Sequence, residues 1–348
     1  MNELLVYSLK SGILLTLLYL PYVLMLRRER FFRLNRMALL GMVLMSVVLP
    51  LCRVSYSVNA DETVTSIVET QDLAFRAEAM IVEANRWDVW QWLSLLYIIG
   101  VVVALCYRVY LLLLVRRFIV RGSLWQQRKA DGTTIYCHAA GEVPFSWMHS
   151  IVISQQDYEQ NAREVLLHEQ AHICCGHSFD ILLLTVVKVL QWWNPVVYLL
   201  EKSLRDVHEY EADDHVLRQG VSLSAYQTLL VRKAMQGASL AFANNFNRSS
   251  VMKRIDMMRR PPSNPWMRSK LLYVVPILAI TLVVSARPVF EPLILLDGEE
   301  ISGDRFAHIQ EDSIDHVEVL KGVSATTLYG EKGRGGAIVV TTKNASSE

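Results

Sequence analysis

The sequence predicts a mainly α-helical membrane protein with four transmembrane helices, a helical catalytic region and a small α+β domain at its C-terminal end. Three observations support this fold class. The 348-residue chain is 52% hydrophobic, and its mean hydropathy of +0.24 is higher than soluble enzymes usually show. Four long apolar stretches alternate with polar segments. After residue 290, short apolar strands alternate with turns rich in Gly, Asp and Asn.

The four apolar stretches are candidate transmembrane spans, because about 20 apolar residues in a helix cross a bilayer. They cover residues 3–26, 37–52, 91–115 and 271–286. The second and fourth are short and need flanking residues or a thin bilayer. The first is predicted to be retained rather than cleaved as a signal peptide, because its basic residues follow the apolar run. Residues 1–115 therefore form a transmembrane region with three spans.

Lysine and arginine clusters predict the orientation in a bacterial inner membrane, because basic loops stay in the cytoplasm. Such clusters occupy residues 27–36, 116–129 and 253–270. The N-terminus, the loop at 53–90 and the chain after residue 287 are then periplasmic, and residues 116–265 are cytoplasmic. The formal net charge of +1 gives no indication of direct nucleic-acid binding. The five cysteines do not form a disulfide framework.

The pentapeptide HEQAH at residues 168–172 predicts a catalytic metal site. On a helix, His168 and His172 lie one turn apart on the same face, so both imidazoles can bind one zinc ion. Glu169 then lies beside a water at the metal and can accept its proton as the water attacks a carbonyl. The alternative is an exposed helix carrying two ordinary histidines.

A third His does not follow at the spacing found in one group of zinc peptidases. Cys175 stands where that pattern requires Gly, and Ser178 stands where it requires His. His177 is therefore expected at a helix end or beside a ligand rather than on the metal.

The segment HEYEAD at 208–213 offers a better third ligand. Glu209 and Asp213 are four residues apart and share one helical face. Glu209 can complete a site of two histidines and one glutamate, and Asp213 can hold a ligand imidazole through its free N–H. Glu211 does not share this face and is expected to be dispensable for zinc. The alternative is a solvated acidic helix.

The apolar run at residues 181–200 is long enough to span a membrane but contains Lys188, Gln191, Asn194 and Pro195. If it spanned, the two ends of the metal site would lie on opposite sides of the bilayer. We therefore expect a buried or membrane-apposed helix that is broken near Pro195.

These motifs together resemble the membrane sensor metallopeptidases of the BlaR/MecR type. The resemblance rests on PFSWMHSIVIS (144–154), HEQAH, WWNPVVYLL (192–200) and HEYEAD, and it covers about residues 90–260. The E-x-x-A-D element is also similar to that of the HtpX and CAAX-prenyl proteases. The resemblance implies a zincin-like peptidase region in which His168, His172 and Glu209 bind zinc, Glu169 is the general base and Asp213 supports a ligand.

Residues 290–344 resemble the plug domain of TonB-dependent receptors. DSIDHVEVLKG, ATTLYGEKG and GGAIVVTTK carry this resemblance, and strands are expected at 293–296, 316–320 and 337–342. A periplasmic signal-sensing or protein-binding role is expected, with a purely structural cap as the alternative. The β-lactam sensors differ here: the only S-x-x-K is Ser250 to Lys253, on the predicted cytoplasmic side, and it lacks its partner motifs.

The resemblance implies transmembrane signalling, in which the peptidase cuts itself or a cytoplasmic repressor of the winged-helix kind. Two alternatives remain. One is a membrane quality-control protease of the HtpX kind. The other is a non-catalytic envelope receptor or scaffold, against which the intact H-E-x-x-H argues.

Overall fold

The structure is a computed structural model that describes residues 3–52, 55–58, 88–139, 143–236, 241–285, 287–290, 292–301, 303–306, 308, 313–321 and 323–342. The chain divides into two compact units. The first comprises residues 1–51 and 87–281, and the second comprises residues 52–86 and 282–348. Of the predicted periplasmic loop at 53–90, the structure describes only residues 55–58 and 88–90.

Among the described residues, three helices of the first unit are long and apolar enough to cross a membrane: α1 (Glu3–Met25), α2 (Phe32–Val48, continued to Leu51 by the 3-10 helix η1) and α4 (Val89–Arg121). These helices indicate membrane association. The predicted fourth span contains α10 (Val274–Ser285), which has only 12 residues and follows the 3-10 helix η2 (Pro265–Tyr273). That span remains a prediction.

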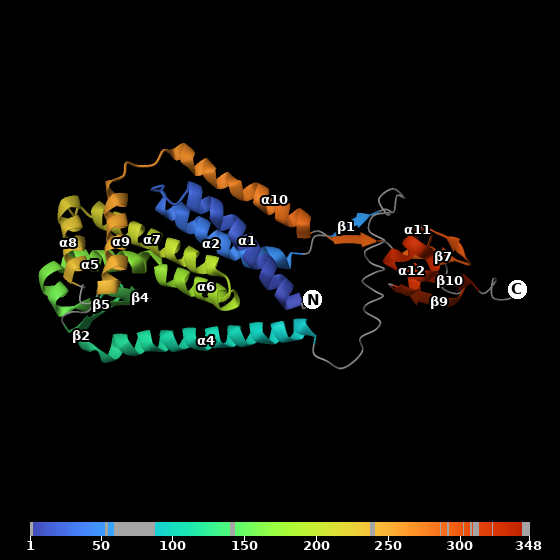
Figure 1. Cartoon of the computed structure of the whole chain (residues 1–348), viewed down its shortest axis with the longest axis horizontal. Helices are drawn as coiled ribbons and strands as arrows, with labels where there is room; N and C mark the ends of the chain where they lie inside the picture. The colour runs from blue at the N-terminus through green and yellow to red at the C-terminus, as the bar shows by residue number, and fades with distance from the viewer. Residues whose placement is uncertain are drawn as a thin grey trace. The chain divides into compact units, whose positions relative to one another are not determined.

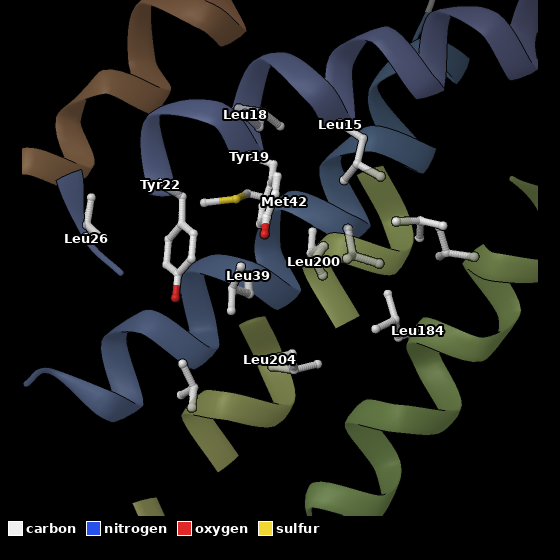
Figure 2. Packing of buried hydrophobic residues seen from close by; sticks show 14 of the residues in the cluster. Leu15, Leu18, Tyr19, Tyr22, Leu26, Leu39, Met42, Leu184, Leu200 and Leu204 are labelled. Carbon is white, nitrogen blue, oxygen red and sulfur yellow. The ribbon is translucent and has the colours of Figure 1, made fainter. Parts of the chain in front are cut away.

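The main hydrophobic core lies where α1 and α2 pack against α6 (His177–Leu190) and α7 (Pro195–Arg218). Figure 2 shows leucines and tyrosines of these four helices pointing toward one another. Leu15 and Leu18 of α1, Leu39 of α2 and Leu200 of α7 are fully buried. This packing fixes the α6–α7 pair against the apolar helices of the chain.

The apolar run at 181–200 is broken as the sequence predicts, and it turns back on itself. Asn194 accepts a hydrogen bond from the N–H of Val196 and so caps α7, with Pro195 in its first turn. The tip contacts α1, where Gln191 donates to Ser11 (2.6 Å) and Trp193 donates to Ser8 (2.9 Å). Because α6 runs to this tip and α7 returns, the run does not separate His172 from Glu209 (Figure 1).

A four-stranded sheet accompanies the metal-site helices, so the expectation of a helical catalytic region was incomplete. Its strands are β2 (Ser123–Arg128), β3 (Thr134–His138), β4 (Phe145–Trp147) and β5 (Ser150–Ser154), in the order β2-β3-β5-β4. The sheet leads into α5 (Gln155–Cys175), and α8 (Leu223–Gln236) and α9 (Ala241–Arg259) follow α7. Strands of three to six residues give too short an alternation to be recognised in the sequence.

The basic connection between α1 and α2 contacts helix α7. Arg27 of the connection pairs with Asp206 (3.6 Å), and Arg30 pairs with Asp214 (3.6 Å); the two acids lie on α7. Lys270 pairs with Glu29 of the connection (2.7 Å). The clusters at 27–36 and 253–270 therefore lie together, as a common side of the membrane requires.

The second unit contains a small α+β fold. Strands β7 (Leu293–Leu296), β9 (Ile314–Leu320) and β10 (Ala337–Thr342) confirm the three predicted strands, and β8 (Glu299–Glu300) completes a sheet in the order β8-β7-β10-β9. Helices α11 (Gly303–Phe306) and α12 (Val323–Tyr329) accompany it, and the 3-10 helix η4 (Gly330–Gly335) connects α12 to β10. A Cβ at Gly333 would lie 2.3 Å from a backbone oxygen, so glycine is required there.

A further strand pair joins the two segments of this unit. Strand β1 (Ser55–Val58) follows α2, and it pairs in parallel with β6 (Arg287–Phe290), which follows α10. Hydrogen-bonded strands must lie on one side of a bilayer. The pairing therefore agrees with the predicted common side of the 53–90 loop and the C-terminal segment.

Candidate metal centre

Helix α5 presents His168 and His172 on one face, as the HEQAH spacing predicts. Ser154 accepts a hydrogen bond from the N–H of Asp157 (3.1 Å) and starts the helix. Gly176 ends it in the left-handed conformation, with φ of 72°. The Nε2 atoms of His168 and His172 lie 3.2 Å apart, so both imidazoles point to the same place.

Glu209 of α7 joins the two histidines. Its carboxylate oxygens lie 3.4 Å from Nε2 of His168 and 3.8 Å from Nε2 of His172. Ligand atoms about 2.0–2.1 Å from a tetrahedral zinc ion lie about 3.3–3.4 Å apart. The two imidazole nitrogens and the two oxygens of one carboxylate lie close to these separations. Their chemistry also suits zinc, and the three residues form a candidate metal group.

The outer side of His168 is held by three residues, one of them predicted. Asp213 lies 3.4 Å from Nδ1 of His168, the atom that zinc would leave free. Tyr226 of α8 lies 3.0 Å from the same nitrogen and donates its hydroxyl proton to Asp213 (2.8 Å). Arg254 of α9 binds Asp213 through two nitrogens and also contacts Glu209 at 2.9 Å. Arg254 thus fixes both acids of the shared face.

The outer side of His172 is held by His177, the first residue of α6. The two Nδ1 atoms lie 2.7 Å apart, and Nε2 of His177 lies 3.2 Å from Glu211. His177 is therefore at a helix end and beside a ligand, as expected. Glu211 lies away from the face of Glu209, but it contacts His177 and can therefore act on a candidate ligand indirectly, which the sequence did not indicate.

Glu169 is 6% exposed and lies between the metal group and the sheet. Burial raises the pKa of its carboxyl group, while the nearby His168 and a hydrogen bond with Ser146 of β4 act to lower it. Glu169 and Ser146 line a cavity of about 870 Å³ that is also lined by His168, His172 and Glu209. A substrate in this cavity can therefore reach the candidate base and the candidate metal ligands together.

The charges around the metal group favour a bound cation. Burial opposes a charge on His168, but hydrogen bonds with Asp213 and Glu209 raise its pKa to about 9. Burial and the neighbouring His168 lower the pKa of His172 to about 3. Burial also opposes the charge on Glu209, but Arg254 and His168 hold the pKa of that carboxyl well below its usual range. Two imidazole nitrogens and an ionised carboxylate are groups that can bind a metal ion.

Tyr226 and Arg254 were missed by the sequence analysis. Tyr226 lies 58 residues after His168 in the sequence, and Arg254 lies 41 residues after Asp213. No local motif marks either residue. Tyr210 of the HEYEAD segment packs into the hydrophobic core beside Phe32. His208 lines the cavity and lies 2.8 Å from Asp180.

Comparison with known proteins agrees with this geometry. The search of curated proteins found no match. The family described as BlaR1 peptidase M56 matches residues 14–258, from α1 to the end of α9 and including every residue of the candidate metal centre. The match ends before residues 290–344, whose resemblance to a plug domain remains a prediction. The matched part exceeds half of the chain, and the protein therefore belongs to the BlaR1 peptidase M56 family of membrane-associated metallopeptidases.

Proposed function

We propose that this protein is a zinc metalloendopeptidase, with His168, His172 and Glu209 as the zinc ligands and Glu169 as the general base. The observation that carries the proposal is the convergence of two imidazole nitrogens and the Glu209 carboxylate, at 3.2–3.8 Å, on the wall of a cavity that also contains the buried Glu169.

Zinc bound to these residues would supply positive charge that polarises a scissile carbonyl and makes an attacking water more acidic. The protein supplies the proton transfers. Glu169 accepts the proton of the water and then donates it to the leaving amine. Arg254 keeps Glu209 ionised and in place, and Asp213 with Tyr226 orients His168.

The biological role that we propose is signalling across the inner membrane, in which the peptidase cuts itself or a cytoplasmic repressor after a periplasmic event. Family membership supports a membrane-associated peptidase, and the α+β unit offers a module for a periplasmic partner.

Proteomic comparison of cells carrying the wild type or Glu169→Gln tests this role. We expect cleavage products of one or a few proteins, a repressor or the chain itself, only with the wild type and only after induction. Constitutive cleavage of many damaged membrane proteins would favour the quality-control alternative. Identical proteomes under inducing conditions would favour a non-catalytic receptor or scaffold.

The signalling role requires a defined sidedness, which gives a second test. A reporter that is active only in the periplasm should be active when fused after residue 344, and inactive when fused near residue 160 or 240. The reason is that the basic clusters at 27–36, 116–129 and 253–270 all favour the cytoplasm. Opposite results at 160 and 240 would contradict a cytoplasmic metal site, and a cytoplasmic C-terminal fusion would contradict transmembrane signalling.

A further inference from the structure

We infer that Arg36 of the apolar helix α2 is a positioning residue for the metal site, acting on His172 through two buried carboxylates and His177. The inference rests on the proposed function for the role of His172 as a ligand, and it adds a link from a candidate membrane span to the metal.

Arg36 connects α2 to the segment where α5 ends and α6 begins. Its Nε lies 2.6 Å from one oxygen of Asp180, and one terminal nitrogen lies 3.2 Å from the other oxygen, so the guanidinium binds this carboxylate in bidentate fashion. The same nitrogen donates to the carbonyl of Cys175 (2.5 Å). The other terminal nitrogen lies 3.5 Å from Glu211. One buried cation therefore serves two carboxylates and the last turn of α5.

The two carboxylates each hold one imidazole of a stacked pair. Asp180 lies 2.8 Å from Nε2 of His208, and Glu211 lies 3.2 Å from Nε2 of His177. The rings of His177 and His208 stack at 4.0 Å with an interplanar angle of 11°. A carboxylate can only accept from these nitrogens, so both rings keep their protons on Nε2 and stay in one orientation.

This arrangement selects one tautomer of the ligand His172. Because the proton of His177 is on Nε2, its Nδ1 accepts the hydrogen bond at 2.7 Å from Nδ1–H of His172. The Nε2 of His172 is then left with its lone pair toward His168 and Glu209, where a metal ion needs it. The contacts that run from Arg36 through Glu211 and His177 to His172 thus orient this ligand from a distant helix.

Arg36 is needed because the carboxylates that it pairs are buried. The side chains of Asp180 and Glu211 are 8% and 9% exposed, and that of Arg36 is 16% exposed. Removing the cation leaves two buried acids without their main counter-charge, which is costly. We expect the acids to reorient, and His177 to lose the hydrogen bond that fixes its ring.

The test uses full-length protein in detergent and compares Arg36→Gln with Arg33→Gln. Arg33 is a matched control, because it lies on the same helix and 3.7 Å from Glu211 but its side chain is 92% exposed. We expect Arg36→Gln to weaken zinc binding by about 10–100-fold, measured by competition with a chelator, and to change the visible spectrum of the cobalt-substituted protein. Arg33→Gln should match the wild type in both. Arg36→Lys should fall between, because an ammonium cannot bind two carboxylates as a fork does.

A double-mutant cycle separates this role from a general loss of stability. If Arg36 acts through His177, then adding Arg36→Gln to His177→Gln should lower zinc affinity little further. Effects that add fully, or wild-type zinc affinity in Arg36→Gln, would overturn the inference. If the wild type itself binds no zinc, the proposed function fails instead. Thermal unfolding of the metal-free variants confirms that each compared protein is folded.

Discussion

Glu169→Gln is expected to lower proteolysis by at least about 100-fold while the protein keeps one zinc ion per chain. The loss of a general base costs about 10²–10⁴-fold in rate. The amide has the shape of the carboxyl group but cannot accept the proton of the attacking water. Because Glu169 is placed beside the three candidate ligands and not among them, its replacement should leave metal binding intact.

The measurement combines metal analysis of the purified protein with cleavage of fluorescent casein and of the chain itself. Glu159→Gln is a matched control, because Glu159 lies on the same helix but is exposed and does not line the cavity. It should cleave like the wild type. Undiminished cleavage by Glu169→Gln would exclude the mechanism, and loss of zinc in this variant would show that Glu169 is a ligand.

Glu209→Ala is expected to lower zinc affinity and activity together. The loss should exceed the roughly 10–100-fold that usually follows when a residue supporting a metal ligand is replaced. Its carboxylate is the only anionic group of the candidate metal group, and its two oxygens lie 3.4 Å and 3.8 Å from the two imidazole nitrogens. The truncation to Ala also removes one of the two carboxylates that pair with the charged guanidinium of Arg254. Glu209→Gln is therefore a second variant, because its amide oxygen can still accept from Arg254 while the charge is lost.

Zinc affinity of the metal-free proteins, measured by chelator competition, decides this prediction. Asp214→Asn is the control, because Asp214 lies on α7 next to Asp213 but is half-buried and pairs with Arg30 and Arg218. Wild-type affinity in both Glu209 variants would remove Glu209 from the ligand set. Replacing Asp213 or Glu211 should cost about 10–100-fold, because each acts on a ligand imidazole rather than on the metal.

Local periodicity accounts for the parts of this protein that could be predicted from its sequence. The hydrogen-bonding pattern of a helix places residues four apart on one face, whatever the rest of the chain does. That is why the pairs His168 with His172 and Glu209 with Asp213 were identified with the correct faces. Apolar length likewise predicted α1, α2 and α4, although α2 begins at Phe32, five residues earlier than expected.

That earlier start has a consequence for the metal site. It places Arg36 within the helix rather than in a loop, where its guanidinium can reach Asp180. The sequence suggested only that arginines near residue 36 mark the cytoplasmic side. The apolar content of a segment predicts its span but not which polar residue at its end becomes buried.

By itself, the sequence predicted the apolar helices α1, α2 and α4, the break at Pro195, three strands near the C-terminal end, and the faces of α5 and α7 that carry the candidate metal ligands. Only the tertiary structure decided that the 181–200 run turns back, that Tyr226 and Arg254 hold the ligands, and that Arg36 lies behind His172. The physical reason is distance along the chain: Arg36 and Asp180 are separated by 144 residues. Buried charges select their partners only after the helices pack, because the cost of burial, and not any local pattern, dictates which groups must pair.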